Sequence, residues 1–310
     1  MARKSAFPCV ILLSCATLLS GCAGIFRRGH QPTVASRLER ARTLYGEEKL
    51  DQARKIFKKL SDRDVYDAAT AEEATFYLGE CHYQQRNYVD AYRTYRTLLE
   101  KHRSNRYFET AVRRQFFIGA AYCNGQISNF WKKKGFGARI LKEALKYQPF
   151  GEFSAQAMLI LGNYYFDKGN YDDALIRYEL LIREYGNSPE VNPARYRKAL
   201  CLYNTLQGNR YDSGELGEAI ESLEDAEELV SHQAKSKTAT RQLSDIRRKL
   251  NDLREAGAKE NYDVARFYLK NGKPRAAATY FHEILEEAPH SHYAELARKA
   301  LDGIAEEITR

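Results

Sequence analysis

The sequence predicts an all-α protein built as an elongated array of helical hairpins. Three observations lead to this fold class. One spacing of small and aromatic residues recurs four times, turn-forming residues lie between its two halves, and only one stretch, near the start, is apolar enough to engage a bilayer. The 22 Tyr and 14 Phe supply enough apolar surface for a folded core, which argues against a disordered chain.

The first residues are typical of an export signal rather than of the fold. Arg3 and Lys4 precede an apolar run over residues 6–19, which is shorter than the roughly 20 residues of a membrane-spanning helix. The run ends at Leu19-Ser20-Gly21-Cys22, which resembles the bacterial lipobox. The resemblance implies that residues 1–21 are a lipoprotein signal peptide and that Cys22 is acylated. An ordinary signal peptide that happens to contain a cysteine is the alternative.

Residues 22–34 are expected to form a lipidated tether. Ala23 stands where an Asp would signal inner-membrane retention in many Gram-negative bacteria, so we expect sorting to the periplasmic face of the outer membrane. The formal net charge is +8, but basic and acidic residues are interspersed throughout. Together with the export signal, this distribution argues against nucleic acid as a partner.

One spacing defines the predicted repeat. A small residue precedes an alanine by 12 positions, and an aromatic residue follows that alanine by four. Small residues are expected where two antiparallel helices approach most closely, and the aromatic residue, one turn further on, is expected to pack against the next repeat. The matching sets are Ala41, Ala53 and Phe57; Gly79, Ala91 and Tyr95; Gly162, Ala174 and Tyr178; and Ala265, Ala277 and Phe281.

This pattern resembles the tetratricopeptide repeat, which implies a right-handed superhelical solenoid. Two further units are stretched, one by a loop over residues 124–136 that includes Trp131 and Lys132-Lys133-Lys134, the other around residues 208–214. The polar segment 231–259 is expected to be a long helix that leads into the last repeat. We therefore predict six hairpins and a capping helix over Tyr293–Ile308.

Residues 135–310 resemble a narrower family, the BamD outer-membrane assembly lipoproteins. Residues 148–154, with Pro149-Phe150-Gly151, join two hairpins much as a linker of that family does. Residues 185–202 resemble its long linker and following helix, and residues 253–271 resemble its last repeat. Residues 35–134 are then N-terminal tetratricopeptide-like hairpins, and those over 35–120 precede the usual first repeat of the family.

The family resemblance implies a non-catalytic lipoprotein scaffold of the machinery that assembles outer-membrane β-barrel proteins. Its expected partners are a barrel-assembly protein with periplasmic repeats, unfolded outer-membrane proteins, and the membrane through the lipid anchor. A periplasmic adaptor that coordinates cell-envelope or division proteins is the alternative within the binding class. A peptidoglycan-processing enzyme is the alternative from another class.

The sequence lacks the motifs of catalytic, metal and nucleotide sites. His282-Glu283 has no second histidine at zinc-protease spacing, His290 and His292 are typical of a loop beside Pro289, and no nucleophile elbow or phosphate-binding loop occurs. We predict no enzyme activity, no catalytic residues, no metal and no cofactor. Cys81, Cys123 and Cys201 lie in apolar helical runs and are expected to be buried thiols, with one disulfide as the alternative.

The predicted partner-binding residues come from repeat geometry. The first helix of each hairpin is expected to line the concave side, where aromatic and charged side chains suit an extended peptide or a partner domain. The alternative is a solvated concave face whose aromatic residues pack between helices. The residues expected to be exposed there are Phe76, Glu80, Tyr83 and Gln84 in the second repeat, Asn163, Phe166 and Asp167 in the fourth, and Tyr262, Arg266 and Lys270 in the last.

Overall fold

The computed structural model describes residues 33–62, 64–101, 106–127, 134–206, 213–232 and 236–309. The predicted signal peptide, Cys22 and Trp131 lie outside these ranges, as do most of the tether and most of residues 208–214. Within them the chain forms thirteen helices: α1 (Val34–Gly46), α2 (Leu50–Leu60), α3 (Ala68–Gln84), α4 (Tyr88–Lys101), α5 (Phe108–Cys123), α6 (Lys134–Tyr147), α7 (Ser154–Phe166), α8 (Tyr171–Glu184), α9 (Val191–Leu206), α10 (Ser213–Ser231), α11 (Lys237–Lys270), α12 (Pro274–Glu287) and α13 (His292–Thr309).

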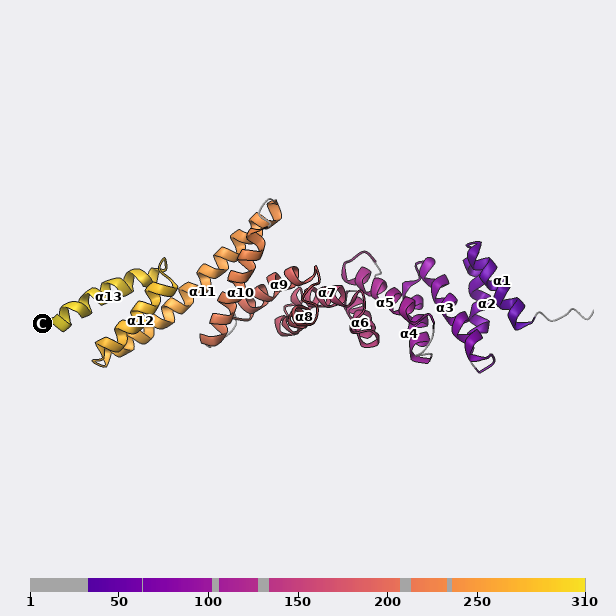
Figure 1. The fold of residues 1–310 in the computed structure, drawn as a ribbon, viewed down its shortest axis with the longest axis horizontal. Coiled ribbons are helices and arrows are strands. Elements are labelled where there is room, and N and C mark those ends of the chain that lie inside the picture. The colour runs from indigo at the N-terminus through magenta and orange to yellow at the C-terminus, as the bar shows by residue number, and fades with distance from the viewer. Residues whose placement is uncertain are drawn as a thin grey trace, which may run out of the picture.

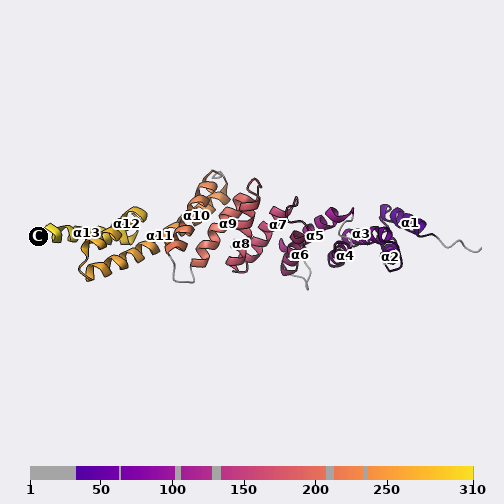
Figure 2. The same ribbon diagram turned by 60° about the horizontal axis from the view of Figure 1, so that its bottom comes forward.

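Consecutive helices pack as pairs, and the pairs follow one another along an extended array (Figures 1 and 2). α1 lies at one end of the array and α13 at the other. The predicted order of six hairpins and a terminal helix is confirmed for the described residues. The boundary of one stretched unit was wrong, because Lys134 and Phe136 already belong to α6 rather than to the loop. The buried ring of Phe136 lies edge-on against Tyr92 and Tyr122, which holds the first turn of α6 in place.

Small residues mark the closest approach of paired helices, as predicted. A Cβ atom on Gly137 of α6 would lie 2.6 Å from the carbonyl oxygen of Gly119 on α5, so neither position accommodates a larger residue without movement. In two other hairpins the glycine faces a tyrosine ring. A Cβ on Gly79 would lie 2.6 Å from Cε1 of Tyr95, and a Cβ on Gly162 would overlap the ring of Tyr178.

These contacts correct one expectation about the repeat. The aromatic residue of the second helix was expected to pack against the next repeat, but the rings of Tyr95 and Tyr178 lie over the glycine of their own hairpin. Both side chains are fully buried. The missing Cβ of the glycine makes room for the ring, so the small residue and the aromatic residue form one packing unit inside each hairpin.

The predicted long helix before the last repeat is α11, with 34 residues and a length of about 50 Å. Its N-terminal half buries Ile246, Leu250 and Leu253 in a cluster with residues of α9 and α10. Its C-terminal half buries Ala258 and Ala265 in a separate cluster with residues of α12 and α13. One uninterrupted helix therefore belongs to two successive packing units, as its course in Figure 1 shows.

Candidate partner-binding surfaces

The second hairpin does not present Phe76 and Glu80 as predicted, and their expected exposure was wrong. Phe76 is 8% exposed and its ring stacks on Tyr107, with the ring centroids 4.1 Å apart. Glu80 is 4% exposed and accepts hydrogen bonds from the Tyr95 hydroxyl at 2.5 Å and from two nitrogens of Arg114 at 2.9 and 2.8 Å. Tyr107, just before α5, therefore covers Phe76, while Tyr95 of the same hairpin and Arg114 of the next hairpin cover Glu80.

Two buried carboxylates, each paired with partly exposed arginines, join the first three hairpins. Glu73 of α3 lies between Arg42 of α1, at 2.5 Å, and Arg106 just before α5, at 2.6 Å. About two turns further along α3, Glu80 pairs with Arg114 of α5. The hydrogen bonds to Glu80 raise the pKa of the Arg114 guanidinium. A carboxylate buried this deeply is stable only with such partners. Sequence reasoning missed these ion pairs, since their members come from three different hairpins.

Tyr83 and Phe166 occupy equivalent positions, each four residues after the glycine of its hairpin. Both rings are half-buried, and each lies under an arginine of the next hairpin: the Arg114 guanidinium is 4.4 Å from the Tyr83 ring centroid, and that of Arg197 is 4.9 Å from the Phe166 centroid. These cation–π contacts join successive hairpins along their first helices. The rings keep part of their surface open to solvent, as a binding role requires.

The other predicted residues differ in exposure. Gln84 is exposed and donates to the Tyr45 hydroxyl, and Asp167 is exposed and lies 3.5 Å from the Lys134 ammonium group. Asn163 is half-buried and accepts a hydrogen bond from Tyr178 at 2.8 Å. Each of these polar groups has a partner within the chain, which an incoming ligand would have to replace.

The end of α11 carries the most open of the predicted surfaces. Arg266 and Lys270 are exposed, whereas Tyr262 is half-buried with its ring centroid 5.7 Å from Phe281 and 5.5 Å from Tyr293. Phe267 is 63% exposed beside the two cations, although sequence reasoning did not select it. Two cations and an uncovered aromatic ring together form a surface suited to protein contact.

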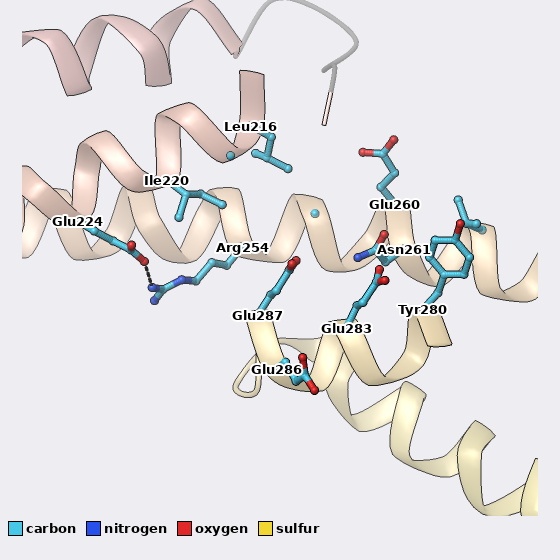
Figure 3. Close-up of a pocket in the computed structure, with 13 residues that line it drawn as sticks. Leu216, Ile220, Glu224, Arg254, Glu260, Asn261, Tyr280, Glu283, Glu286 and Glu287 are labelled. Atoms are coloured by element: carbon cyan, nitrogen blue, oxygen red, sulfur yellow. Dashed lines mark hydrogen bonds and ion pairs between the residues drawn. The ribbon is translucent and has the colours of Figure 1, made fainter. Parts of the chain in front are cut away.

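A cleft of about 710 Å³ lies where α10 and α12 both flank α11, and we call it the acidic cleft (Figure 3). It includes none of the partner-binding residues that the sequence predicted. Its apolar part consists of Leu216, Ile220, Val264 and Tyr280, and its glycines are Gly217 and Gly257. Its charged and polar residues are Glu224, Arg254, Glu260, Asn261, Glu283, Glu286 and Glu287.

The charge of the acidic cleft is strongly unbalanced. Five glutamates line it against one arginine, and that arginine is already paired with Glu224 at 2.5 Å. In the part of the chain that the structure describes, the other four glutamates form no ion pair. Figure 3 shows the side chains of Glu283 and Glu287 pointing from α12 toward α11, while that of Glu260 points from α11 away from α12 and that of Glu286 points away from α11. The signal in the sequence was the run of glutamates near the end of α12.

Two structural tests bear on other kinds of site. Across the described ranges, no group of three or more histidine, cysteine, aspartate or glutamate residues is arranged to hold a metal ion. Over the same ranges, no helix combines the length and apolarity that crossing a membrane requires. Cys81, Cys123 and Cys201 are buried free thiols, so the structure favours the predicted thiols over the alternative disulfide.

The hairpin array defines an all-α helical-repeat protein with charged surfaces open to solvent. The chain belongs to the outer membrane lipoprotein family YfiO, whose model matches residues 120–308, and a tetratricopeptide-repeat model matches residues 38–106. The family assignment makes it an outer membrane lipoprotein, as the lipobox and the linker resemblance predicted. The family match begins inside α5, so the hairpins α1/α2 and α3/α4 precede it.

A curated relative is the outer membrane protein assembly factor BamD of Caulobacter vibrioides, 26% identical over 145 residues. The match covers 47% of this chain and 45% of the relative, so the chain spans about half the length of that protein. Similar solved structures include a tetratricopeptide repeat protein from Parabacteroides merdae, 14% identical with a TM-score of 0.39, covering 88% of this chain and 98% of that one. Another is MamA AMB-1, 14% identical with a TM-score of 0.38, covering 67% and 96%.

Proposed function

We propose that the chain is a non-catalytic scaffold of the machinery that inserts β-barrel proteins into the outer membrane. The observation that carries this proposal is the family match over residues 120–308, together with the similarity to an outer membrane protein assembly factor. Its partners are a barrel-assembly protein with periplasmic repeats and unfolded outer-membrane proteins. A lipid on Cys22 holds the array at the periplasmic face of the membrane.

The array suits a scaffold because its surfaces are spread along its length. The cationic end of α11 with Phe267 and the acidic cleft differ in charge, so they select partners of different chemistry. The first three hairpins are joined by ion pairs to two buried glutamates, which gives the added N-terminal part a fixed shape before any partner arrives. A preorganised surface loses less conformational entropy on binding than a flexible one.

Depletion in the native host, combined with affinity purification from detergent-solubilised envelopes, tests the scaffold role. We expect a large β-barrel protein with periplasmic repeats to co-purify, and porins to disappear from the outer membrane as the chain is depleted. Normal porin levels after complete depletion, with only cell-wall proteins co-purifying, would refute the proposal. That result would support the alternative of an adaptor for cell-envelope or division proteins.

The lipid anchor has its own test. Cys22→Ala should leave the chain unprocessed or released from membranes, and the N-terminal peptide should lack any lipid mass. Cys15→Ala is the matched control, because Leu12-Leu13-Ser14-Cys15 is the weaker lipobox-like match within the same apolar run. Equal membrane association of the Cys22→Ala variant and the parent would contradict the anchor assignment.

A further inference from the structure

We propose that the acidic cleft is the docking site for a basic amphipathic segment of a partner protein. In this arrangement Lys or Arg side chains of the segment pair with the glutamates, and its apolar side chains pack on Ile220, Val264 and Tyr280. The partner's role in barrel assembly rests on the proposed scaffold function. The binding of a basic segment to the cleft does not depend on it and is measured separately.

The cleft is produced by the way one helix serves two packing units. α10 packs along the N-terminal half of α11 and α12 along the C-terminal half, and the two apolar clusters that hold them share no residue. The space left between α10 and α12 is the cleft. Its volume of about 710 Å³ lies in the range of sites that enclose ligands rather than of packing defects.

The floor of the cleft is suited to apolar side chains. Ile220 of α10, Val264 of α11 and Tyr280 of α12 line it and are only half-buried, so each retains apolar surface that a partner can cover. Gly217 has no atom within 4 Å of the position that a Cβ would occupy, which keeps the α10 side open. Covering such apolar surface removes it from water and so favours binding.

A second observation, independent of the cleft shape, favours a cationic occupant. α12 ends in glutamates and has no basic residue in its last turn. The C-terminal end of a helix is the negative end of its dipole, so acidic residues there are destabilising. An incoming cation relieves this unfavourable interaction.

The distribution of charge selects a segment over a single ion. The glutamates come from three helices, and no group of three acidic residues in the described ranges converges to hold a metal. Spread charges separated by apolar surface match the pattern of an amphipathic peptide. The whole chain carries a formal net charge of +8, whereas the cleft is negatively charged. This difference in sign directs a basic segment to the cleft rather than to the rest of the surface.

The test uses the full-length lipoprotein in nonionic detergent. The probe is a fluorescein-labelled 16-residue peptide with Lys and Leu placed on opposite faces of a helix, and binding is followed by fluorescence anisotropy. A peptide with Glu in place of each Lys should not bind. Neutralising the cleft should weaken binding of the Lys peptide at least tenfold in 50 mM salt. The difference in affinity between the parent and the cleft variant should be smaller in 500 mM salt, because salt screens the charges. The cleft variant is Glu260→Gln/Glu283→Gln/Glu287→Gln.

A matched control removes the same charge elsewhere. Glu109, Glu184 and Glu295 are exposed and lie outside the cleft, so replacing all three by Gln should change the dissociation constant less than twofold. A photoreactive benzoylphenylalanine in place of one Leu of the probe should crosslink to peptides that contain Ile220 or Tyr280. Equal weakening by both triple variants, or unchanged binding by the cleft variant, would overturn the inference.

These outcomes are separable from those of the scaffold proposal. If the cleft does not select the basic peptide but depletion still removes porins, the docking inference fails and the scaffold function stands. If the peptide binds as expected while porin levels stay normal, the scaffold proposal fails and the cleft remains a docking site. Thermal unfolding of each variant accompanies the measurements. The cleft variant should retain the parental melting temperature or exceed it, whereas the control variant, which loses the favourable first-turn charges of Glu109 and Glu295, should melt slightly lower.

Discussion

The hydroxyl group of Tyr178 donates a hydrogen bond to Oδ1 of Asn163, 2.8 Å away, across the two helices of one hairpin. Tyr95 makes the equivalent bond to Glu80 in the second hairpin, at 2.5 Å and with the same separation of 15 residues. In both hairpins the acceptor directly follows the glycine over which the tyrosine ring lies. The repeat thus uses this position to fasten its own two helices, with an amide in one hairpin and a carboxylate in the other.

The contact between ring and glycine predicts a large effect from a single methyl group. Gly162→Ala should lower the free energy of unfolding by about 1–3 kcal/mol, because its Cβ overlaps the Tyr178 ring in a fully packed hairpin. Gly303→Ala is the control, since no atom lies within 4 Å of its added Cβ, and it should stabilise α13 by about 0.5–1 kcal/mol. Urea unfolding measures both, and equal stabilities would contradict the packing unit.

The ion pair between the buried Glu80 of α3 and Arg114 of α5 predicts that removing its carboxylate costs more stability than breaking an exposed pair. Glu80→Gln leaves Arg114 without its carboxylate and should cost about 3 kcal/mol of stability. Glu100→Gln breaks an exposed pair with Arg96, whose partners are 44% and 57% exposed, and should change stability by less than about 0.5 kcal/mol. Chemical denaturation of the two variants side by side checks the difference, which a loss of similar size in both would refute.

The acidic end of α12 predicts a gain of stability on neutralisation. Glu287→Gln removes a negative charge from the negative end of the helix dipole. It should raise the free energy of unfolding by about 0.3–1 kcal/mol, and the melting temperature should rise slightly with it. Glu295→Gln is the opposite control, because Glu295 lies in the first turn of α13, where a negative charge is favourable. Differential scanning calorimetry should therefore show shifts of opposite sign, and shifts of the same sign would be inconsistent with this account.

Three buried thiols predict slow alkylation and sensitivity to alkaline conditions. Burial raises the pKa of Cys81 and of Cys201 to about 12, and that of Cys123 to about 11. The folded state therefore favours the protonated thiols, so their contribution to stability is complete below the unfolded pKa near 9 and is lost as the pH rises toward these values. Mass spectrometry after iodoacetamide treatment at pH 8 should find the three cysteines unmodified until denaturant is added. Rapid native labelling would show that they are accessible.

The cationic end of α11 predicts a large loss of binding with only a small loss of stability. Arg266→Glu/Lys270→Glu reverses two exposed charges beside Phe267, so partner capture from solubilised envelopes should fall. The melting temperature should drop only slightly, because Lys270→Glu places a negative charge in the last turn of α11. Arg195→Glu/Arg298→Glu makes the same change of charge at other exposed positions and should leave capture intact. Capture by the first variant at the parental level would refute the assignment.

The sequence predicted the architecture well because its signals are local. Gly79 and Gly162, with an alanine 12 residues later and an aromatic residue after that, specify a hairpin without reference to any other repeat. The start of α6 was placed a few residues late, since the packing of Phe136 against Tyr92 involves the preceding hairpin. The prediction that Phe76 and Glu80 are exposed was wrong for a related reason, because residues of the next hairpin contact both side chains.

Surfaces between hairpins could not be predicted from one repeat at a time. Whether a first-helix residue faces solvent depends on the side chains of the next hairpin, and Tyr107 and Arg114 cover two of the chosen positions. The acidic cleft required the relative placement of α10 and α12, which are separated along the chain by the whole of α11. Glu283 and Glu287 were visible in the sequence, but their placement in one cleft with Glu260 was not.

Because α11 is one continuous helix, the number of residues in it sets the orientation of α12 and α13 around its axis. Each residue added to an α-helix advances it by about 1.5 Å and turns everything beyond it by about 100°. A single alanine inserted between Leu253 and Ala258 would therefore swing α12 and α13 about a quarter turn around the α11 axis, while the apolar contacts of each half could re-form. Glu283 and Glu287 would then face a different direction from Glu224. The number of residues in α11, rather than any contact across the acidic cleft, therefore sets how α10 and α12 are aligned on its two sides.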